Sequence, residues 1–355
     1  MDTIIVKMDE SDIDEEKICQ AAEIIRSGGL VAFPTETVYG LGANALDSVA
    51  STKIYAAKGR PSDNPLIAHI ADLEMLKPLV EEIPETARKL MDAFWPGPMT
   101  LIFRKSDLVP KETTGGLDTV AVRYPNHKIA QALIREAGVS IAAPSANLSG
   151  KPSPTLGEHV IDDMDGRIDM IIDGGMVGMG LESTIVDVTA ETPMILRPGF
   201  ITKEMLQDVI GEVKIDPAIL EKPTEGLRPK APGMKYRHYA PKADFTIYRG
   251  NKNKVTEEIL KRANEKAKQG FLTGIITAEE HLKLYEGKTD ENISVIALGN
   301  LEHPETIANH LFQVLREFDK QGAEFIYGEA FSEDHIGQAI MNRLTKAAGY
   351  QIIDL

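Results

Sequence analysis

The sequence predicts an α/β protein of two domains: a larger mixed α/β domain over residues 1–210 and a smaller three-layer α/β domain over residues 244–355. Three observations lead to this prediction. The chain has 355 residues, which is more than one ordinary hydrophobic core accommodates. Strand and helix patterns alternate regularly only in the last third of the chain. The segment 211–243 between them is rich in proline and basic residues, and we expect it to be a linker.

In the first domain, apolar residues at helical spacing predict helices, and short apolar runs predict strands. The first helix covers 15–26, and Gly28 and Gly29 are its stop signal. The other predicted helices are 47–57, 84–94, 128–136, 158–164 and 201–210. The predicted strands are 30–35, 65–70, 99–104, 119–125, 140–145, 170–173, 183–189 and 194–199.

The second domain alternates strands with helices, which is typical of a Rossmann-like sandwich with a largely parallel sheet. No Gly-x-Gly-x-x-Gly follows its first strand, so we assign it no dinucleotide. It carries no other chemical motif. The predicted strands are 245–250, 272–277, 293–300 and 323–331, and the predicted helices are 255–269, 306–320 and 337–348.

The composition limits the class of protein. The net charge of −15 makes strong, sequence-independent binding of nucleic acid unexpected, because such binding requires phosphate neutralisation. The sequence shows no apolar run of membrane-spanning length and no signal peptide, so we expect a cytoplasmic protein. One cysteine, Cys19, excludes an intrachain disulfide and a cysteine-cluster metal site. Against this acidic background, residues 222–242 carry a net charge of +5.

Hydroxyl groups and basic groups recur where strands end. In AFPTETVYGLGANA (32–45), a strand runs into Thr35, Thr37 and Tyr39, and Gly40 and Gly42 follow. Such a stretch predicts either a polar pocket wall that a ligand can approach closely or an ordinary tight turn.

Lys58 and Arg60 lie two residues apart in a segment that we expect to be an extended loop. A lysine and an arginine there suit a polyanion, although a solvated basic loop is the simpler alternative. His69 lies on a predicted strand and, taken alone, is more typical of a half-buried histidine with satisfied hydrogen bonds than of a catalyst.

Arg123 lies on an otherwise apolar strand, so it needs an anionic partner if it is buried. That partner is either a structural carboxylate or the carboxylate of a substrate. The stretch IAAPSANLSGKPSPT (141–155) ends a strand in hydroxyl groups, an amide and a glycine. It predicts a phosphate- or ribose-binding loop or an ordinary surface turn. No Ser-His-Asp set, metal-ligand spacing or P-loop lysine stands out, so the pattern favours binding and orienting anions.

The chain resembles the YrdC-like threonylcarbamoyl-AMP synthases, in their long form with an appended C-terminal domain. The resemblance covers nearly the whole chain and rests on several motifs in the right order. The only departures are Met99 for an expected leucine and Ser140 for an expected proline, and neither replaces a polar site residue. The motifs are PTETVYGLG (34–42), KGRPSDNPL (58–66), WPGPMT (95–100), VAVRYP (120–125), APSANLSGKPSPT (143–155), ESTIVD (182–187), LRPG (196–199), PGMKYRHYAP (232–241) and GQAIMNRLTKAAG (337–349).

The resemblance implies a YrdC-like mixed twisted sheet and a nucleotidyltransferase that converts L-threonine, bicarbonate and ATP, with Mg²⁺, into threonylcarbamoyl-AMP and pyrophosphate. The product then serves other enzymes that modify tRNA. Residues carried over by motif for threonine are Thr35, His69, Arg123, Ala143 and Ser183. Those for ATP are Lys58, Arg60, Asn64, Thr119, Ser145, Asn147, Ser153, Arg197 and Tyr236, with Lys58 and Arg60 as the catalytic pair; no residue is assigned as a metal ligand.

The resemblance also implies that the linker 211–243 folds over the nucleotide as a lid, with a semi-rigid proline spacer as the alternative. The sequence offers no obvious general base. Three other functions stay open: an RNA-binding module of the tRNA-modification pathway, an enzyme that adenylates a different acid, and a carbamoyltransferase. The sequence does not separate threonine from serine as the substrate.

Overall fold

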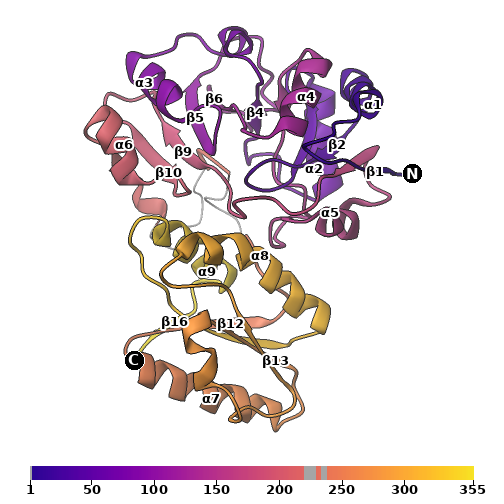
Figure 1. Ribbon diagram of the computed structural model, residues 1–355. Helices are drawn as coiled ribbons and strands as arrows, with labels where there is room; N and C mark the ends of the chain where they lie inside the picture. The colour runs from indigo at the N-terminus through magenta and orange to yellow at the C-terminus, as the bar shows by residue number, and fades with distance from the viewer. Residues whose placement is uncertain (1, 220–228, 233–237) are drawn as a thin grey trace. The chain divides into compact units, whose positions relative to one another are not determined.

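The computed structural model describes residues 2–219, 229–232 and 238–355. The chain divides into two compact units. The first contains Met1–Ser149 and Ser153–Tyr236, and the second contains Gly150–Pro152 and Arg237–Leu355. Figure 1 shows the elements of each unit. The fold class predicted from the sequence is confirmed: the first unit carries one large mixed sheet and the second a smaller parallel one.

The first unit is built on an eleven-stranded sheet in the order β1-β8-β2-β3-β7-β4-β6-β5-β9-β10-β11. The sheet mixes parallel and antiparallel pairs; β4 and β6 run parallel, whereas β5 and β6 run antiparallel. The strands are β1 (Ile4–Lys7), β2 (Val31–Phe33), β3 (Gly40–Asn44), β4 (Ile67–His69), β5 (Met99–Arg104), β6 (Thr119–Arg123), β7 (Ile141–Ala142), β8 (Met170–Asp173), β9 (Thr184–Asp187), β10 (Met194–Arg197) and β11 (Lys214–Ile215).

Helices cover both faces of this sheet. On one face α1 and α4 pack together over Val31, Phe33, Ile141 and Met170. On the other face the core includes residues of α2, α3, α5 and α6. The helices are α1 (Glu15–Arg26), α2 (Ser48–Lys58), α3 (Glu85–Phe94), α4 (Lys128–Ala137), α5 (Gly157–Met164) and α6 (Lys203–Ile210).

Local sequence signals set the ends of these helices. The carboxylate of Asp47 accepts hydrogen bonds from the amides of Val49 and Ala50 and so caps the start of α2. Gly59 ends the same helix with φ of 61°, a left-handed conformation that glycine adopts at little cost. Lys58 is therefore the last residue of a helix, and our expectation that it lies in an extended loop is wrong.

The second unit has five strands, all parallel, in the order β14-β13-β15-β12-β16. On β13, Ile275 packs with α7, whereas a side chain at Gly274 would meet the ring of Phe318 on α8, so helices lie on both faces. The elements are β12 (Asp244–Arg249), α7 (Lys252–Ala267), β13 (Thr273–Thr277), β14 (Ile293–Ala297), α8 (Pro304–Gln321), β15 (Phe325–Glu329), α9 (Gly337–Ala347) and β16 (Ile352–Asp354).

Among the described residues, the strands that we did not predict are β1, β3, β11 and β16. β1 and β16 lie at sheet edges with exposed or half-buried side chains, and β11 pairs parallel with β10. The pairing of β11 places residues 214–215, which we had counted in the linker, in the sheet of the first unit. Edge strands are short and lack a continuous apolar pattern, so periodicity alone does not reveal them.

Candidate active site

The candidate site lies on the half of one sheet face that α1 and α4 do not cover. Ile141 packs beneath those helices, and its partner across the ladder on β4 is His69. Partners across a ladder share one face. Next to His69, this face carries a small cluster of apolar side chains, which we call the apolar floor. It contains Ala231 of the linker and the sheet residues Ile67, Ile102, Ala121, Ile185 and Leu196.

The strand register gathers polar side chains beside this floor. Arg123, at the end of β6, pairs with His69 on β4 and with Thr100 on β5. The hydroxyl oxygens of Thr100 and Ser183 are 2.7 Å apart. Arg197 donates from Nε to the carbonyl of Ser183 at 3.0 Å and from Nη2 to its Oγ at 3.1 Å. All five residues are buried, so their positions are fixed by the sheet.

Three groups contact the guanidinium of Arg123. Its Nη2 lies 2.7 Å from Oε1 of Glu36 in an ion pair, and its Nη1 donates to Oγ1 of Thr37 at 2.8 Å. Its Nε donates to the carbonyl of Gly97 at 3.4 Å. Arg123 is 4 % exposed and Glu36 is 9 % exposed. The anionic partner that a buried arginine requires is thus a structural carboxylate, one of the two alternatives left open by the sequence.

Thr35 continues this network. Its Oγ1 donates to the carbonyl of Val38 at 2.6 Å and lies 2.9 Å from Oγ1 of Thr37. The amide of Thr37 donates back to the same Oγ1 at 3.2 Å. The turn that follows β2 therefore places the two threonine hydroxyls against Arg123.

His69 is neutral at physiological pH. Burial, and to a smaller extent the charge of Arg123, lowers the pKa of its imidazole from 6.5 to about 3. Its Nδ1 lies 3.0 Å from the carbonyl of Ile67, which makes Nδ1 the protonated nitrogen. We call the whole cluster the arginine pole; it consists of Thr35, Glu36, Thr37, His69, Thr100, Arg123, Ser183 and Arg197.

Lys58 anchors a second cluster. It is buried at the end of α2, and its ammonium donates to the carbonyl of Ser145 and, at 2.5 Å, to the carbonyl of Asn147. Ser145 Oγ donates to Asn147 Oδ1 at 2.6 Å. The loop after β7 therefore wraps around a lysine, as the Lys-x-Arg and Ser-x-Asn motifs together imply.

Arg60 and Asn64 lie beside this loop. The Nη2 of Arg60 donates to the carbonyls of Pro65 at 3.2 Å and Asn64 at 3.4 Å. Asn64 is 2 % exposed, and among the described residues its Oδ1 has no hydrogen-bond partner. Thr119 starts β6, two residues before Ala121, which pairs with Ile67 on β4. We call this cluster the lysine pole; it consists of Lys58, Arg60, Asn64, Thr119, Ser145 and Asn147.

Three predicted residues fall outside these clusters. Ser153 donates from Oγ to Oε1 of the buried Glu182 at 2.5 Å. The amide of Ala143 donates to the carbonyl of Ile67 at 2.9 Å, so that amide belongs to the sheet and not to a ligand. Tyr236 lies outside the described residues.

The glycines after β2 lie in β3, where they leave room for neighbouring side chains. Gly42 lies in β3, where an added Cβ would come within 2.8 Å of the side chains of Ile141 and Phe33. The hydroxyl of Tyr39 donates to the carbonyl of Gly175 at 2.6 Å. These residues make room for neighbouring groups, so the residues of this stretch that reach the site are Thr35, Glu36 and Thr37.

Sequence reasoning missed Glu36 and Thr100. Glu36 stands between two predicted hydroxyls in the stretch Thr-Glu-Thr, and the need of Arg123 for a counter-ion was the only signal that pointed to a carboxylate. Thr100 is identified only by pairing with Arg123 across the β5–β6 ladder.

The described parts of the linker belong to different units. Pro229, Ala231 and Pro232 are buried within the first unit, and Ala231 joins its apolar floor. In the second unit, the ring of Tyr239 stacks on Phe312 with centroids 5.0 Å apart. Of the aromatic and basic residues that make this segment unusual, Tyr239 therefore packs against the second unit instead of facing a ligand.

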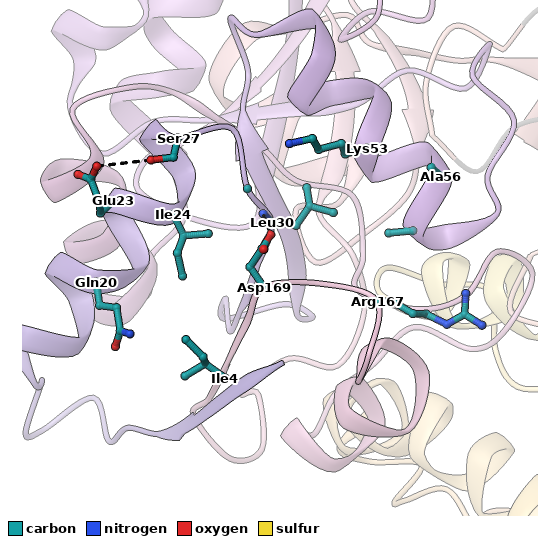
Figure 2. A pocket seen from close by; sticks show the side chains of 12 residues that line it. Ile4, Gln20, Glu23, Ile24, Ser27, Leu30, Lys53, Ala56, Arg167 and Asp169 are labelled. Atoms are coloured by element: carbon teal, nitrogen blue, oxygen red, sulfur yellow. Dashed lines mark hydrogen bonds between the residues drawn. The ribbon is translucent and has the colours of Figure 1, made fainter. Parts of the chain in front are cut away.

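A pocket in the first unit is separate from these clusters. Figure 2 shows twelve lining residues, among them Ile4, Lys53 and Asp169, and none belongs to either pole. The Nζ of Lys53 donates to the carbonyl of Gly28 at 2.6 Å, and Asp169 accepts the amide of Leu30 at 2.7 Å. Lys53 and Asp169 thus bind backbone groups of the protein itself, and we assign no function to this pocket.

In the described part of the chain, no three His, Cys, Asp or Glu side chains are placed to hold a metal ion. A Mg²⁺ ion that enters with the phosphates of a nucleotide does not require such a cluster. No described helix is both long enough and apolar enough to span a membrane.

Comparison with known proteins identifies the family. Residues 23–199 match the Sua5/YciO/YrdC family model, described as telomere recombination, and residues 201–349 match the threonylcarbamoyl-AMP synthase C-terminal domain. The chain is 50 % identical to the threonylcarbamoyl-AMP synthase of Pyrococcus abyssi over 354 residues, covering 99 % of each chain, and 48 % identical to that of Bacillus subtilis, covering 97 % of this chain and 96 % of the relative.

A crystal structure supports the same assignment. Sua5 of P. abyssi in complex with L-threonine superposes with a TM-score of 0.92 at 50 % identity, covering 99 % of this chain and all of that one. Both units are therefore shared with these relatives. The chain belongs to the Sua5/YciO/YrdC family of threonylcarbamoyl-AMP synthases, in the form with a C-terminal domain.

Proposed function

We propose that the first unit makes threonylcarbamoyl-AMP and pyrophosphate from L-threonine, bicarbonate and ATP. One observation supports this most directly: His69 and Arg123 of the arginine pole end the neighbouring parallel strands β4 and β6, whereas Thr119 of the lysine pole starts β6 and Asn64 precedes β4. The arginine pole suits an amino acid with a hydroxyl group, and the lysine pole suits a phosphate chain. A threonyl group joined to AMP needs both.

At the arginine pole, Arg123 binds the threonine carboxylate. Thr35 and Ser183 lie close enough to that network to select the substrate hydroxyl. His69 is neutral, so it acts as a hydrogen-bonding wall and adds no second positive charge. Ala143 contributes shape, since its amide is already bonded to β4.

At the lysine pole, Lys58 and Arg60 hold the phosphates and stabilise the charge that develops on them, which is why we assign them as catalytic. Ser145 and Asn147 shape the phosphate loop, and Asn64 offers a buried carbonyl oxygen. The remaining ATP contacts are Thr119, Ser153, Arg197 and Tyr236. Mg²⁺ would enter with the phosphates of ATP as part of the substrate.

The reaction proceeds in two bond-forming steps. The threonine amine adds to bicarbonate, or to CO₂, and gives a carbamate. A carbamate oxygen then attacks the α-phosphorus of ATP, and pyrophosphate leaves. The residues of this chain act by positioning the reactants and by stabilising charge.

The linker 211–243 serves as a lid over the nucleotide. Ala231 supports this part of the proposal, because it places one linker residue directly on the apolar floor between the strands of the site. A lid would shield the carbamate from water. Activity should fall at least tenfold in Tyr236→Ala and in a chain cut before Arg228; unchanged turnover in both would favour a proline spacer.

Pyrophosphate release from ATP tests the whole proposal. It should require both bicarbonate and L-threonine, with L-serine and other amino acids as comparisons. Release with another acid would keep the adenylation chemistry and change the substrate. No release, together with tRNA retained on a filter, would favour an RNA-binding module of the same pathway, although a charge of −15 opposes that role.

The product would pass to the enzymes that transfer the threonylcarbamoyl group to tRNA, in the cytoplasm. A coupled assay with a tRNA-modifying extract that has been depleted of its own synthase tests this place in the sequence of reactions. Modified adenosine should appear only when this protein, threonine, bicarbonate and ATP are all present.

A further inference from the structure

We infer that Glu36 is a catalytic residue: its carboxylate binds the α-ammonium of threonine and accepts the proton that this nitrogen must lose. The inference rests on the proposed function and deepens it. Carbamate formation needs a proton acceptor, and Glu36 is the carboxylate that contacts Arg123, the arginine proposed to bind the substrate.

The ion pair of Glu36 with Arg123 is complementary in charge to an α-amino acid. An α-amino acid carries a carboxylate and an ammonium on one carbon. The protein presents a guanidinium and a carboxylate with Nη2 and Oε1 only 2.7 Å apart. A substrate carboxylate on Arg123 therefore brings its own ammonium close to Glu36. The four charges then alternate in sign, which stabilises all of them in a buried site.

The hydrogen bonds of Glu36 leave it able to take such a ligand. Both residues of the pair are buried, yet among the described residues neither carboxylate oxygen of Glu36 has a hydrogen bond beyond the ion pair. A buried carboxylate normally accepts several hydrogen bonds. An ammonium group is a triple donor and would fill the remaining capacity.

The other charged groups near Glu36 do not replace it. His127 is buried close by and interacts electrostatically with Glu36, Glu10 and Arg123, and burial lowers its pKa. Its Nδ1 lies 3.3 Å from Oε1 of Glu10, whose side chain is 46 % exposed. His69 faces Arg123 from β4. Glu36 is the carboxylate in direct contact with the arginine, so it is the group placed to meet the ammonium.

The proton balance requires such an acceptor. Threonine enters with an –NH₃⁺ group. When its nitrogen bonds to the bicarbonate carbon and the hydroxyl leaves, the nitrogen loses two protons. One departs in the water formed from that hydroxyl. The other passes to the Glu36 carboxylate, which returns it to solvent after the product leaves.

The first test compares Glu36→Gln with a matched control, Glu10→Gln, which makes the same change on the other side of His127. The probe is (R)-3-hydroxybutanoate, which keeps the carboxylate and hydroxyl of threonine and lacks the amino group. Wild-type protein and Glu10→Gln should bind threonine about tenfold to a hundredfold more tightly than the probe. Glu36→Gln should bind both compounds with similar affinity. Full preference in Glu36→Gln would overturn the inference.

The second test is the pH profile of pyrophosphate release. Near neutral pH, the rate of pyrophosphate release should be about a hundredfold or more lower in Glu36→Gln than in the wild type. This rate should recover as pH rises, because threonine then arrives as the free amine. Glu36→Asp keeps a carboxylate and should retain the wild-type profile at a lower rate. A Glu36→Gln profile parallel to the wild type would overturn the proton-transfer role.

These outcomes are distinguishable from failure of the proposed function. If wild-type protein shows no threonine-dependent pyrophosphate release, the function itself is wrong. If the wild type is active and ATP affinity and circular dichroism are unchanged in Glu36→Gln, the two tests above judge Glu36 alone.

Discussion

The two poles of the site hold their positive charges in different ways. Arg123 is neutralised by the carboxylate of Glu36, and its Nη1 donates to the hydroxyl of Thr37. The hydrogen bonds of Lys58 to Ser145 and Asn147 go to neutral carbonyl oxygens, which orient its ammonium without cancelling its charge. The first arrangement matches a substrate with no net charge, and the second matches a polyanion. The kind of group that each cation contacts, more than the number of basic residues, distinguishes the amino-acid end from the phosphate end.

The largest effect should come from loss of the Lys58 ammonium. Lys58→Met should lower pyrophosphate release by about a thousandfold, because the phosphates lose a positioned donor and its charge. Steady-state kinetics with saturating threonine measures this loss. Lys53→Met, on the same helix but lining the separate pocket, is the control and should be nearly as active as the wild type. Comparable losses in both variants would mean that α2 is merely disturbed.

Arg123→Gln should raise the KM for threonine by about a hundredfold and leave the KM for ATP close to normal. It should also lower the free energy of unfolding by about 3–5 kcal/mol, because Glu36 stays buried without its partner. Restoring neutrality in Arg123→Gln/Glu36→Gln should recover stability but not threonine affinity. If the double variant recovers both, the compensation is structural only.

Ser183→Ala should have a smaller effect, confined to the side chain of the amino acid. Removing this Oγ deletes a hydrogen bond with Thr100 and one with Arg197. We expect about a tenfold rise in the KM for threonine and a smaller change for an amino acid without a hydroxyl. Competition between threonine and 2-aminobutanoate measures this difference. An equal rise for both substrates would place the hydroxyl of threonine elsewhere.

His69 should affect stability more than catalysis. Its pKa is about 3 in the folded protein against 6.5 in the unfolded chain, so only the unfolded chain binds the proton between these values. Its contribution to stability is therefore lost as pH falls below 6.5. Between pH 7 and pH 5 this loss is about 2 kcal/mol.

Chemical denaturation at the two pH values measures the effect. His69→Gln removes the titrating group and should reduce the pH dependence by that amount. The same pH dependence in wild type and variant would show that His69 binds a proton in the folded state, contrary to its burial beside Arg123.

Much of the site was predictable because it follows strand ends. Arg123 was recognised as a charge that needs an anion, and Lys58 and Arg60 as groups for a polyanion. The choice of anion was not predictable, because Glu36 meets Arg123 through a turn 86 residues away along the chain, as the Arg123–Thr37 bond shows. The surroundings of Gly42 were not predictable for the same reason, because residues of other strands, Ile141 and Phe33, fill the space beside it.

The sequence by itself determined the fold class, most of the helices and strands and the family motifs. These properties depend on local periodicity, capping and composition, which are written in consecutive residues. Only the tertiary structure decided that Arg123 carries its own counter-ion, that Lys58 ends a helix inside a loop of carbonyl groups, and that Tyr239 packs on the second unit. Such pairings depend on the register of strands and on turns far apart in the chain, and no local pattern encodes them.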